Sequence, residues 1–201
     1  MNDRSFASAA SKEERDVDRR TAILDAAMNL FGEVGFHGAT VPQVAERAQV
    51  ATGTIYRYFP SKEALVNAVF QREKEAVGRV LMADVRPDAP IREQFHAFWR
   101  RYAKHAIDHR ASFAFLELHH HGPYLDETSR AVEERVLFGA KAFFELARAQ
   151  QIVKPISAEL AIAIVYGAFA AMVKGCWTGY LELNDETIDA AESCVWEAIR
   201  R

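Results

Sequence analysis

The side chains best suited to chemistry are concentrated in one short stretch, Thr52 to Lys62, which reads TGTIYRYFPSK. Its polar members carry hydroxyl groups, one guanidinium and one ammonium: Thr52, Thr54, Tyr56, Arg57, Tyr58, Ser61 and Lys62. Hydroxyl groups suit phosphate oxygens and base edges, and an arginine suits guanine. Gly53 costs about 1 kcal/mol relative to alanine inside a helix, so it indicates close approach of another molecule to the backbone. The stretch therefore predicts contact with a nucleic acid.

A second group of reactive side chains is the run His119, His120 and His121, which follows His105 and His109 in the chain. Imidazoles four residues apart face one way on a helix, and histidines with Glu117 and Asp126 nearby are suitable ligand types for zinc or nickel. Three consecutive histidines, however, point about 100° apart on a helix, so at most one or two converge. The other interpretation is histidines that are solvated or bonded to backbone carbonyls. A metal-responsive regulator using the His119–His121 region is kept as the alternative function.

An enzymatic interpretation would rest on Glu117 and His120 as an acid–base pair. The sequence offers neither a nucleophile, nor a cofactor loop, nor a second carboxylate at a telling spacing. We therefore predict that the protein is not an enzyme and that it uses no cofactor.

The elements that position the first stretch are two short helices. Thr40 followed by Gln43 forms a capping box, and Pro42 suits a first helical turn, so a helix is expected from Val41. A second helix is expected from Thr52 to Phe59, where Pro60 ends it. Two short helices joined by a tight turn describe a helix-turn-helix, whose second helix can enter the major groove of DNA.

The run VATGTIYRYFPSKEAL resembles the recognition helix and following helix of the TetR family of bacterial repressors, and the resemblance extends back through AILDAAMNLFGEVGFHGATVPQVAERA. It covers roughly residues 19 to 70. One departure is Gln49, which stands where the family usually has glycine in the turn. The resemblance implies a dimeric regulator that is released from a palindromic operator by a small-molecule effector, with repression as the family default.

On this interpretation, residues 1–17 form a flexible tail, residues 18–65 the helix-turn-helix domain and residues 66–201 a helical effector-binding and dimerisation domain. A scaffold helix should end near Val34, with Gly35 as its stop. Ser61 should cap a long helix that Pro87 and Pro90 end. For DNA binding we predict three base-contacting residues and a set that mainly holds phosphate: Thr52, Thr54 and Arg57 for the bases, and Thr40, Gln43, Tyr56, Tyr58 and Lys62 for phosphate. Gly53 belongs to the same predicted interface as the point where the partner approaches the helix backbone.

Composition supports an all-α fold. Half of the 201 residues are hydrophobic, and glycine and proline are few. The net charge is −3, and residues 1–75 hold ten Lys and Arg against eleven Asp and Glu. This balance argues against a tight non-specific DNA binder, since phosphate neutralisation supplies non-specific affinity. No signal peptide and no bilayer-spanning apolar run stand out, so the predicted location is the cytoplasm, with no membrane partner.

The C-terminal region begins with a helix over residues 91–109 that carries a broad aromatic face. Such a face is either plain core or the lining of a pocket for flat or apolar ligands. Ser112 should cap a short helix that Gly122 and Pro123 end. The predicted effector pocket combines this aromatic face with later residues: Phe95, Phe98, Trp99, Tyr102, Phe113, Leu116, Glu117, His120 and Phe144.

Two final helices should form a dimer interface. A helix capped by Ser157 is apolar nearly all round, which indicates burial on more than one side. Asn184 should start the last helix. A two-fold dimer that pairs both helices with their copies is the economical way to cover them. The predicted interface residues combine a small-residue face with an apolar side of the last helix: Gly167, Ala168, Ala171, Gly175, Ile188 and Val195.

Overall fold

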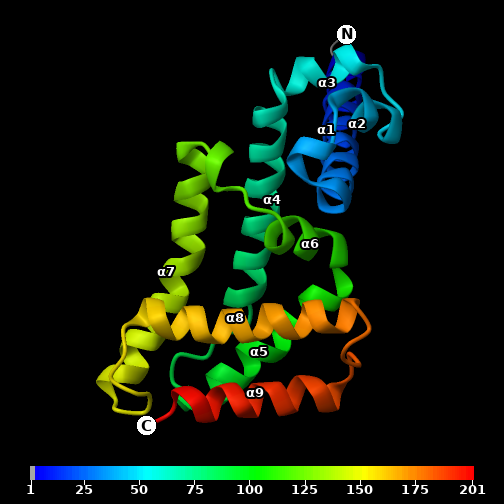
Figure 1. Cartoon of the computed structure of the whole chain (residues 1–201). Helices are drawn as coiled ribbons and strands as arrows, with labels where there is room; N and C mark the ends of the chain where they lie inside the picture. Colours follow the sequence, from blue (N-terminus) through cyan, green and yellow to red (C-terminus); the bar gives the residue numbers. More distant parts are fainter. Residues whose placement is uncertain (1–2) are drawn as a thin grey trace. The chain divides into compact units, whose positions relative to one another are not determined.

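The computed structural model describes residues 3–201, with side chains from Glu14 onward, and the regular elements in this part of the chain are helical (Figure 1). The predicted all-α fold is confirmed. The elements are α1 (Asp3–Gly38), α2 (Val41–Arg47), α3 (Thr52–Tyr58), α4 (Lys62–Met82), α5 (Ile91–Asp108), α6 (Arg110–Leu118), the 3-10 helix η1 (Gly122–Tyr124), α7 (Glu127–Ala149), α8 (Ala158–Trp177) and α9 (Asp185–Ile199). An isolated antiparallel bridge joins Val153 to Arg200.

The chain forms two compact units whose boundaries differ from those expected from the sequence. Unit 1 consists of the residues up to Glu73 together with Ala111–Ser129, and unit 2 consists of Lys74–Arg110 and Arg130–Arg201. Unit 1 thus combines the helix-turn-helix region with α6 and η1, which lie far along the sequence. The long helix α4 contributes its first half to unit 1 and its second half to unit 2.

Side-chain caps define the helix starts where the sequence predicted them. The Thr40 and Gln43 side chains each bond the backbone amide of the other residue, which completes the capping box of α2. Ser61 accepts from the amide of Ala64, and Ser157 and Asn184 cap α8 and α9 in the same way. The prediction for Ser112 was wrong: α6 begins at Arg110, and Ser112 is buried inside it.

The first helix differs from expectation at both ends. The sequence predicts a flexible tail over residues 1–17. The structure instead begins α1 at Asp3, so residues 3–17 are helical. No glycine or proline precedes Gly32 in the sequence, so nothing in the backbone chemistry stops the helix there. At the other end, Gly35 adopts φ 73°, a left-handed conformation that glycine tolerates best. The chain kinks at Gly35 and then turns helical again to Gly38.

Each unit has its own apolar core. In unit 1, α1, α2, α3 and α4 bury Phe31, Val44, Ile55 and Leu65 almost completely. In unit 2, α9 packs along α8 and also contacts α5 (Figure 1). There the buried side chains of α5 and α8 meet, since Phe169 packs edge-on to Trp99.

Helix α8 is, by length and composition, apolar enough to cross a membrane. The core helices of many water-soluble proteins meet the same criterion, so this is weak evidence for a membrane span. Leu160 and Ile164 on α8 are 49% and 39% exposed in the single chain, so part of the apolar side of this helix is open to solvent.

Candidate nucleic-acid interface

Helix α3 is held by a small apolar contact surface and points its polar side chains outward. Ile55 and Phe59 lie four residues apart and are buried, which fixes α3 against the rest of unit 1. The turn before it includes Gln49, whose φ of 55° explains why glycine suits this place in related turns. Among the outward side chains, Tyr56 is 49% exposed. The packing of α3 therefore uses only one side of the helix.

Gly53 lies on the outer face of α3, where the protein itself does not require a glycine. A Cβ atom at this position would meet no other atom of the described structure within 4 Å. Alanine would also favour the helix more than glycine does. The glycine therefore leaves space on the outside of α3, which suits a partner that approaches the helix backbone closely.

Arg57 is held against α1 by a carboxylate that the sequence analysis did not single out. Its Nη2 atom lies 3.3 Å from Oδ1 of Asp16 and donates to the hydroxyl oxygen of Tyr58 at 2.8 Å. The Tyr58 hydroxyl in turn donates to the same Asp16 oxygen. The Arg57 guanidinium also lies 4.8 Å from the centre of the Tyr58 ring. Asp16, Arg57 and Tyr58 form one cluster, called here the α1–α3 cluster.

The other predicted contact residues surround α3 and are partly engaged within unit 1. The Thr40 hydroxyl donates to Oε1 of Gln43 at 2.8 Å, which leaves the Gln43 amide group as a donor beside the start of α2. Lys62 begins α4, and its ammonium lies 4.3 Å from the centre of the Phe36 ring. Phe36 stacks on Tyr124 with ring centroids 4.3 Å apart. The lysine stem is thus positioned by unit 1 while its charge stands at a helix start.

Arg47, the basic residue at the end of α2, is paired with α1. Its guanidinium binds both carboxylate oxygens of Glu33, at 2.7 and 2.9 Å. The hydrogen bond from Arg47 lowers the pKa of Glu33, and the same bond raises the pKa of Arg47. Both side chains are largely solvated, so the pair contributes little stability. Its main effect is to fix where α2 ends relative to α1.

A buried polar cluster around Asn67 of α4 attaches the start of α7 within unit 1. Asn67 is 4% exposed, and its Nδ2 atom donates to the carbonyl oxygens of Glu63 and Tyr124, both at 2.8 Å. Its Oδ1 atom accepts from the amide of Asp126 at 2.9 Å and from the hydroxyl of Ser129 at 2.7 Å. All four hydrogen-bonding positions of the amide are therefore used. The sequence analysis missed this residue, because its partners lie about 60 positions away.

The histidine run is used to hold α6 and η1 within unit 1. His119 Nε2 lies 3.0 Å from the carbonyl oxygen of Gly32, and a Cβ at Gly35 would meet the His119 ring at 3.2 Å. His121 Nε2 lies 2.5 Å from the carbonyl oxygen of Phe115, so this nitrogen carries a hydrogen. The other His121 nitrogen then accepts from Tyr124, whose pKa is raised by burial.

These histidines do not converge. His120 is exposed, while His119 and His121 point to different carbonyl groups. His105 and His109 contact each other in unit 2 with ring centroids 4.6 Å apart and the ring planes tilted by 40°. No group of three or more His, Cys, Asp or Glu side chains with a metal-binding arrangement occurs among the residues that the structure describes. The described geometry therefore gives the metal-responsive alternative no support.

The residues predicted to line an effector pocket are divided between the units. Phe113, Leu116, Glu117 and His120 belong to unit 1. The other five belong to unit 2: Phe95, Phe98, Trp99, Tyr102 and Phe144. Most of this second group forms packed core.

The packing of the aromatic face in unit 2 is close. Tyr102 stacks on Phe169 with centroids 4.5 Å apart, and Trp99 donates from Nε1 to the carbonyl oxygen of Ile188 at 3.0 Å. Beside this core, burial lowers the pKa of Arg101, which donates to the carbonyl oxygen of Leu81 at 3.2 Å. Any ligand among these rings would have to displace side chains that now contact each other.

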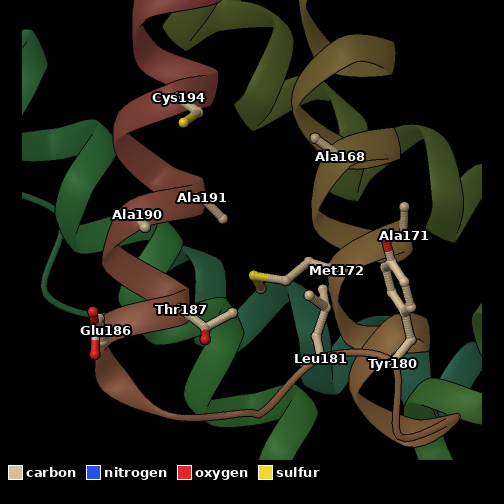
Figure 2. A pocket seen from close by; sticks show the side chains of 10 residues that line it. All are labelled: Ala168, Ala171, Met172, Tyr180, Leu181, Glu186, Thr187, Ala190, Ala191 and Cys194. Atoms are coloured by element: carbon tan, nitrogen blue, oxygen red, sulfur yellow. The ribbon is translucent and has the colours of Figure 1, made fainter.

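The predicted dimer residues of α9 need correction. Ile188 and Val195 are 4% and 7% exposed, because the apolar side of α9 packs inside unit 2. The exposed surface of α8 and α9 includes a groove of about 580 Å³ between the two helices, which Figure 2 shows with the sulfur of Met172 directed into it. Its lining includes the predicted residues Ala168 and Ala171, while Gly167 and Gly175 lie elsewhere on α8. The full lining is Ala168, Ala171, Met172, Tyr180, Leu181, Glu186, Thr187, Ala190, Ala191 and Cys194.

Two family models match the chain and together cover most of it. Residues 23–69 match the model described as bacterial regulatory proteins, tetR family, and residues 70–201 match the tetracyclin repressor-like C-terminal domain. The chain is 47% identical over 60 residues to the HTH-type transcriptional repressor KstR of Rhodococcus jostii, which is 30% of this chain and 28% of KstR. The first curated relatives are thus matched over less than a third of their length.

Two longer similarities extend over both units. The uncharacterized HTH-type transcriptional regulator YhgD of Bacillus subtilis is 25% identical over 174 residues, which are 86% of this chain and 91% of YhgD. A solved structure of a TetR family transcription regulator from Marinobacter aquaeolei superposes with a TM-score of 0.84 at 22% identity, covering 94% of this chain and 98% of the other. This last similarity supports the fold.

Proposed function

Because the chain belongs to the tetR family of bacterial regulatory proteins and is a transcriptional regulator of that type, not an enzyme, we propose that it binds a palindromic operator as a dimer and is released by a small-molecule effector. The observation that carries the proposal is the outer face of α3. Hydroxyl groups, a guanidinium and a glycine occupy that face, while Ile55 and Phe59 hold the helix from behind. These are the groups that contact phosphates and base edges in DNA. The cytoplasm is the location that this role requires.

Within the interface we assign Thr52, Thr54 and Arg57 to base contacts. The phosphate-binding set is Thr40, Gln43, Tyr56, Tyr58 and Lys62, and Gly53 leaves room for the DNA beside the helix backbone. The start of α4 supports the role of Lys62, since the positive end of the helix dipole and a nearby ammonium both favour an anion. Recognition helices of a two-fold dimer would then read half-sites roughly 35 Å apart or somewhat more.

The dimer is proposed to form through the groove between α8 and α9. Ala171 and Ala190 are exposed in this groove, and Leu160 and Ile164 are exposed on α8. Small side chains let helices approach closely, so a second copy of the chain would cover both helices in a four-helix arrangement. We propose Ala168, Ala171, Ala190 and Cys194 as interface residues in place of Ile188 and Val195.

The effector is proposed to bind in the helical C-terminal region. In unit 2 the aromatic side chains around Tyr102 are packed together, so a ligand would favour a conformation in which they separate. An effector changes DNA affinity only if it binds the two conformations with different affinities. Ligand screening by thermal shift, followed by operator release, tests this part of the proposal.

The central experiment is selection of bound sequences from a random duplex pool with the wild-type protein and the Arg57→Ala variant. We expect a palindrome for the wild type. The variant should lose preference at one symmetric base pair, with a cost of about 1–3 kcal/mol per contact. Arg86→Ala is the matched control, because Arg86 is an exposed arginine of unit 2. Absence of any enriched palindrome would contradict the proposal.

A further inference from the structure

Arg20 on α1 is held beside the end of α3. Its guanidinium carbon lies 5.4 Å from the centre of the ring of Phe59, the residue that directly follows α3. Phe59 is 4% exposed, so its ring is anchored in unit 1, while Arg20 is exposed. A guanidinium on an aromatic ring uses its flat face for this contact and keeps the N–H groups at its edge for other acceptors. The ring therefore fixes the position of Arg20 without using its hydrogen-bond donors.

The carboxylate best placed along α1 to neutralise Arg20 is used by α3 instead. Asp16 lies four residues before Arg20, a spacing at which an acid and a base pair on a helix. Its Oδ1 atom accepts from the Tyr58 hydroxyl and lies 3.3 Å from Nη2 of Arg57. No ion pair that includes Arg20 occurs among the residues whose side chains the structure describes. Arg20 thus presents an unneutralised charge next to α3.

Lys62 provides a second cation close to the same point of the chain. It lies three residues after Phe59, at the start of α4, and its ammonium is 4.3 Å from the centre of the Phe36 ring. In the described part of the chain, Lys62 also takes no part in an ion pair. Guanidinium and ammonium groups both donate charge-assisted hydrogen bonds to phosphate oxygens. Two cations that aromatic rings hold near the turn between α3 and α4 therefore favour a polyanion as their partner.

We infer that Arg20 binds a phosphate group of the DNA backbone beside the base pairs that α3 contacts, which makes α1 a part of the nucleic-acid interface. The inference rests on the proposed DNA-binding function of α3. Every base pair carries the same phosphate groups, so this contact adds affinity and fixes the position of α3 without reading the sequence.

The test measures how operator affinity depends on salt for the wild type and for Arg20→Ala. Each phosphate contact contributes about 0.9 to the slope of log affinity against log salt concentration. Loss of one contact in each copy of a two-fold dimer should therefore reduce the slope by about 1.8. Between about 50 and 200 mM salt, the wild type should lose roughly tenfold more affinity than Arg20→Ala does. Arg20→Ala should select the same palindrome as the wild type, because a phosphate contact reads no base.

Two further variants separate a phosphate contact from other roles. Arg19→Ala removes the same charge from the neighbouring exposed position on α1, and it should change the slope much less than Arg20→Ala does. Arg20→Lys keeps a cation that phosphate accepts and should keep most of the slope. If Arg20 only held α1 against Phe59, Arg20→Ala would lower the stability and leave the slope unchanged.

The outcomes distinguish this inference from the proposed function. An unchanged slope in Arg20→Ala, or an equal reduction in Arg19→Ala, would overturn the inference while operator selection by the wild type upheld the proposed function. A different palindrome selected by Arg20→Ala would also overturn it, because Arg20 would then contact a base. Failure of the wild type to select any operator would refute both.

Discussion

The outer face of α3 and the groove between α8 and α9 are both exposed, but they are built from opposite chemistry. The α3 face carries hydroxyl groups and a guanidinium around a glycine that packs against nothing. The groove is lined by alanines, Met172 and Leu181. Buried polar groups need hydrogen-bond partners, and exposed apolar groups gain from leaving water. The difference supports the proposal that one face binds a nucleic acid and the other a second copy of the chain.

The largest effect, on dimerisation, is expected when a charged side chain is introduced into the groove between α8 and α9. Ala171→Arg places a guanidinium in the groove, where a second copy would bury it without a partner. We expect dimerisation to weaken by at least about 100-fold, measured by sedimentation equilibrium, and operator affinity to fall with it. Ala142→Arg on α7 is the control, because Ala142 is exposed and lies outside the groove. Equal effects of both variants would contradict the proposed interface.

A smaller effect, on the free energy of unfolding, should distinguish buried polar groups from the exposed polar groups of the α3 face. Asn67→Ala leaves the Tyr124 carbonyl, the Asp126 amide and the Ser129 hydroxyl without their partner. We expect the free energy of unfolding to fall by about 2–3 kcal/mol, measured by urea denaturation. Tyr56→Phe removes an exposed hydroxyl and should change it by less than about 0.5 kcal/mol. A similar loss in both would mean that the α3 face is structural.

The smallest effect on the fold should come with a clear effect on binding. Gly53→Ala adds a methyl group that meets no atom within 4 Å, so stability should stay unchanged or rise by up to about 1 kcal/mol. Operator affinity should nevertheless fall, because the methyl group occupies space that the DNA backbone would enter. Thermal unfolding and a binding titration measure the two quantities. Unchanged operator affinity would show that nothing approaches the helix at Gly53.

Local sequence signals predicted the starts of α2, α4, α8 and α9 but not that of α6, and they did not predict contacts between distant segments. The caps at Thr40, Ser157 and Asn184 involve residues three positions apart, so the sequence alone specifies them. Asp16 and Asn67 act on partners more than 40 positions away, and no periodic pattern marks such pairs.

The same distinction explains the error on α9. The spacing of Ile188 and Val195 correctly indicated an apolar side of the helix, but periodicity does not say what covers that side. The structure covers it within unit 2, and smaller residues such as Ala190 remain outside. Likewise, the aromatic spacing on α5 could not distinguish core from pocket, and the structure packs Trp99 as core.

The discontinuity of unit 1 limits how its DNA-reading part can be transplanted. A cassette cut after Glu73 would keep the helix-turn-helix but lose residues 111–129. Phe31 would lose its neighbour Phe115, the Gly32 carbonyl would lose His119, and Asn67 would lose most of its hydrogen bonds. Chimeric regulators made by joining this cassette to a foreign C-terminal region therefore need a replacement for α6 and η1. A graft that is joined at the start of α4 would carry the helix-turn-helix without residues 111–129, which belong to the same compact unit.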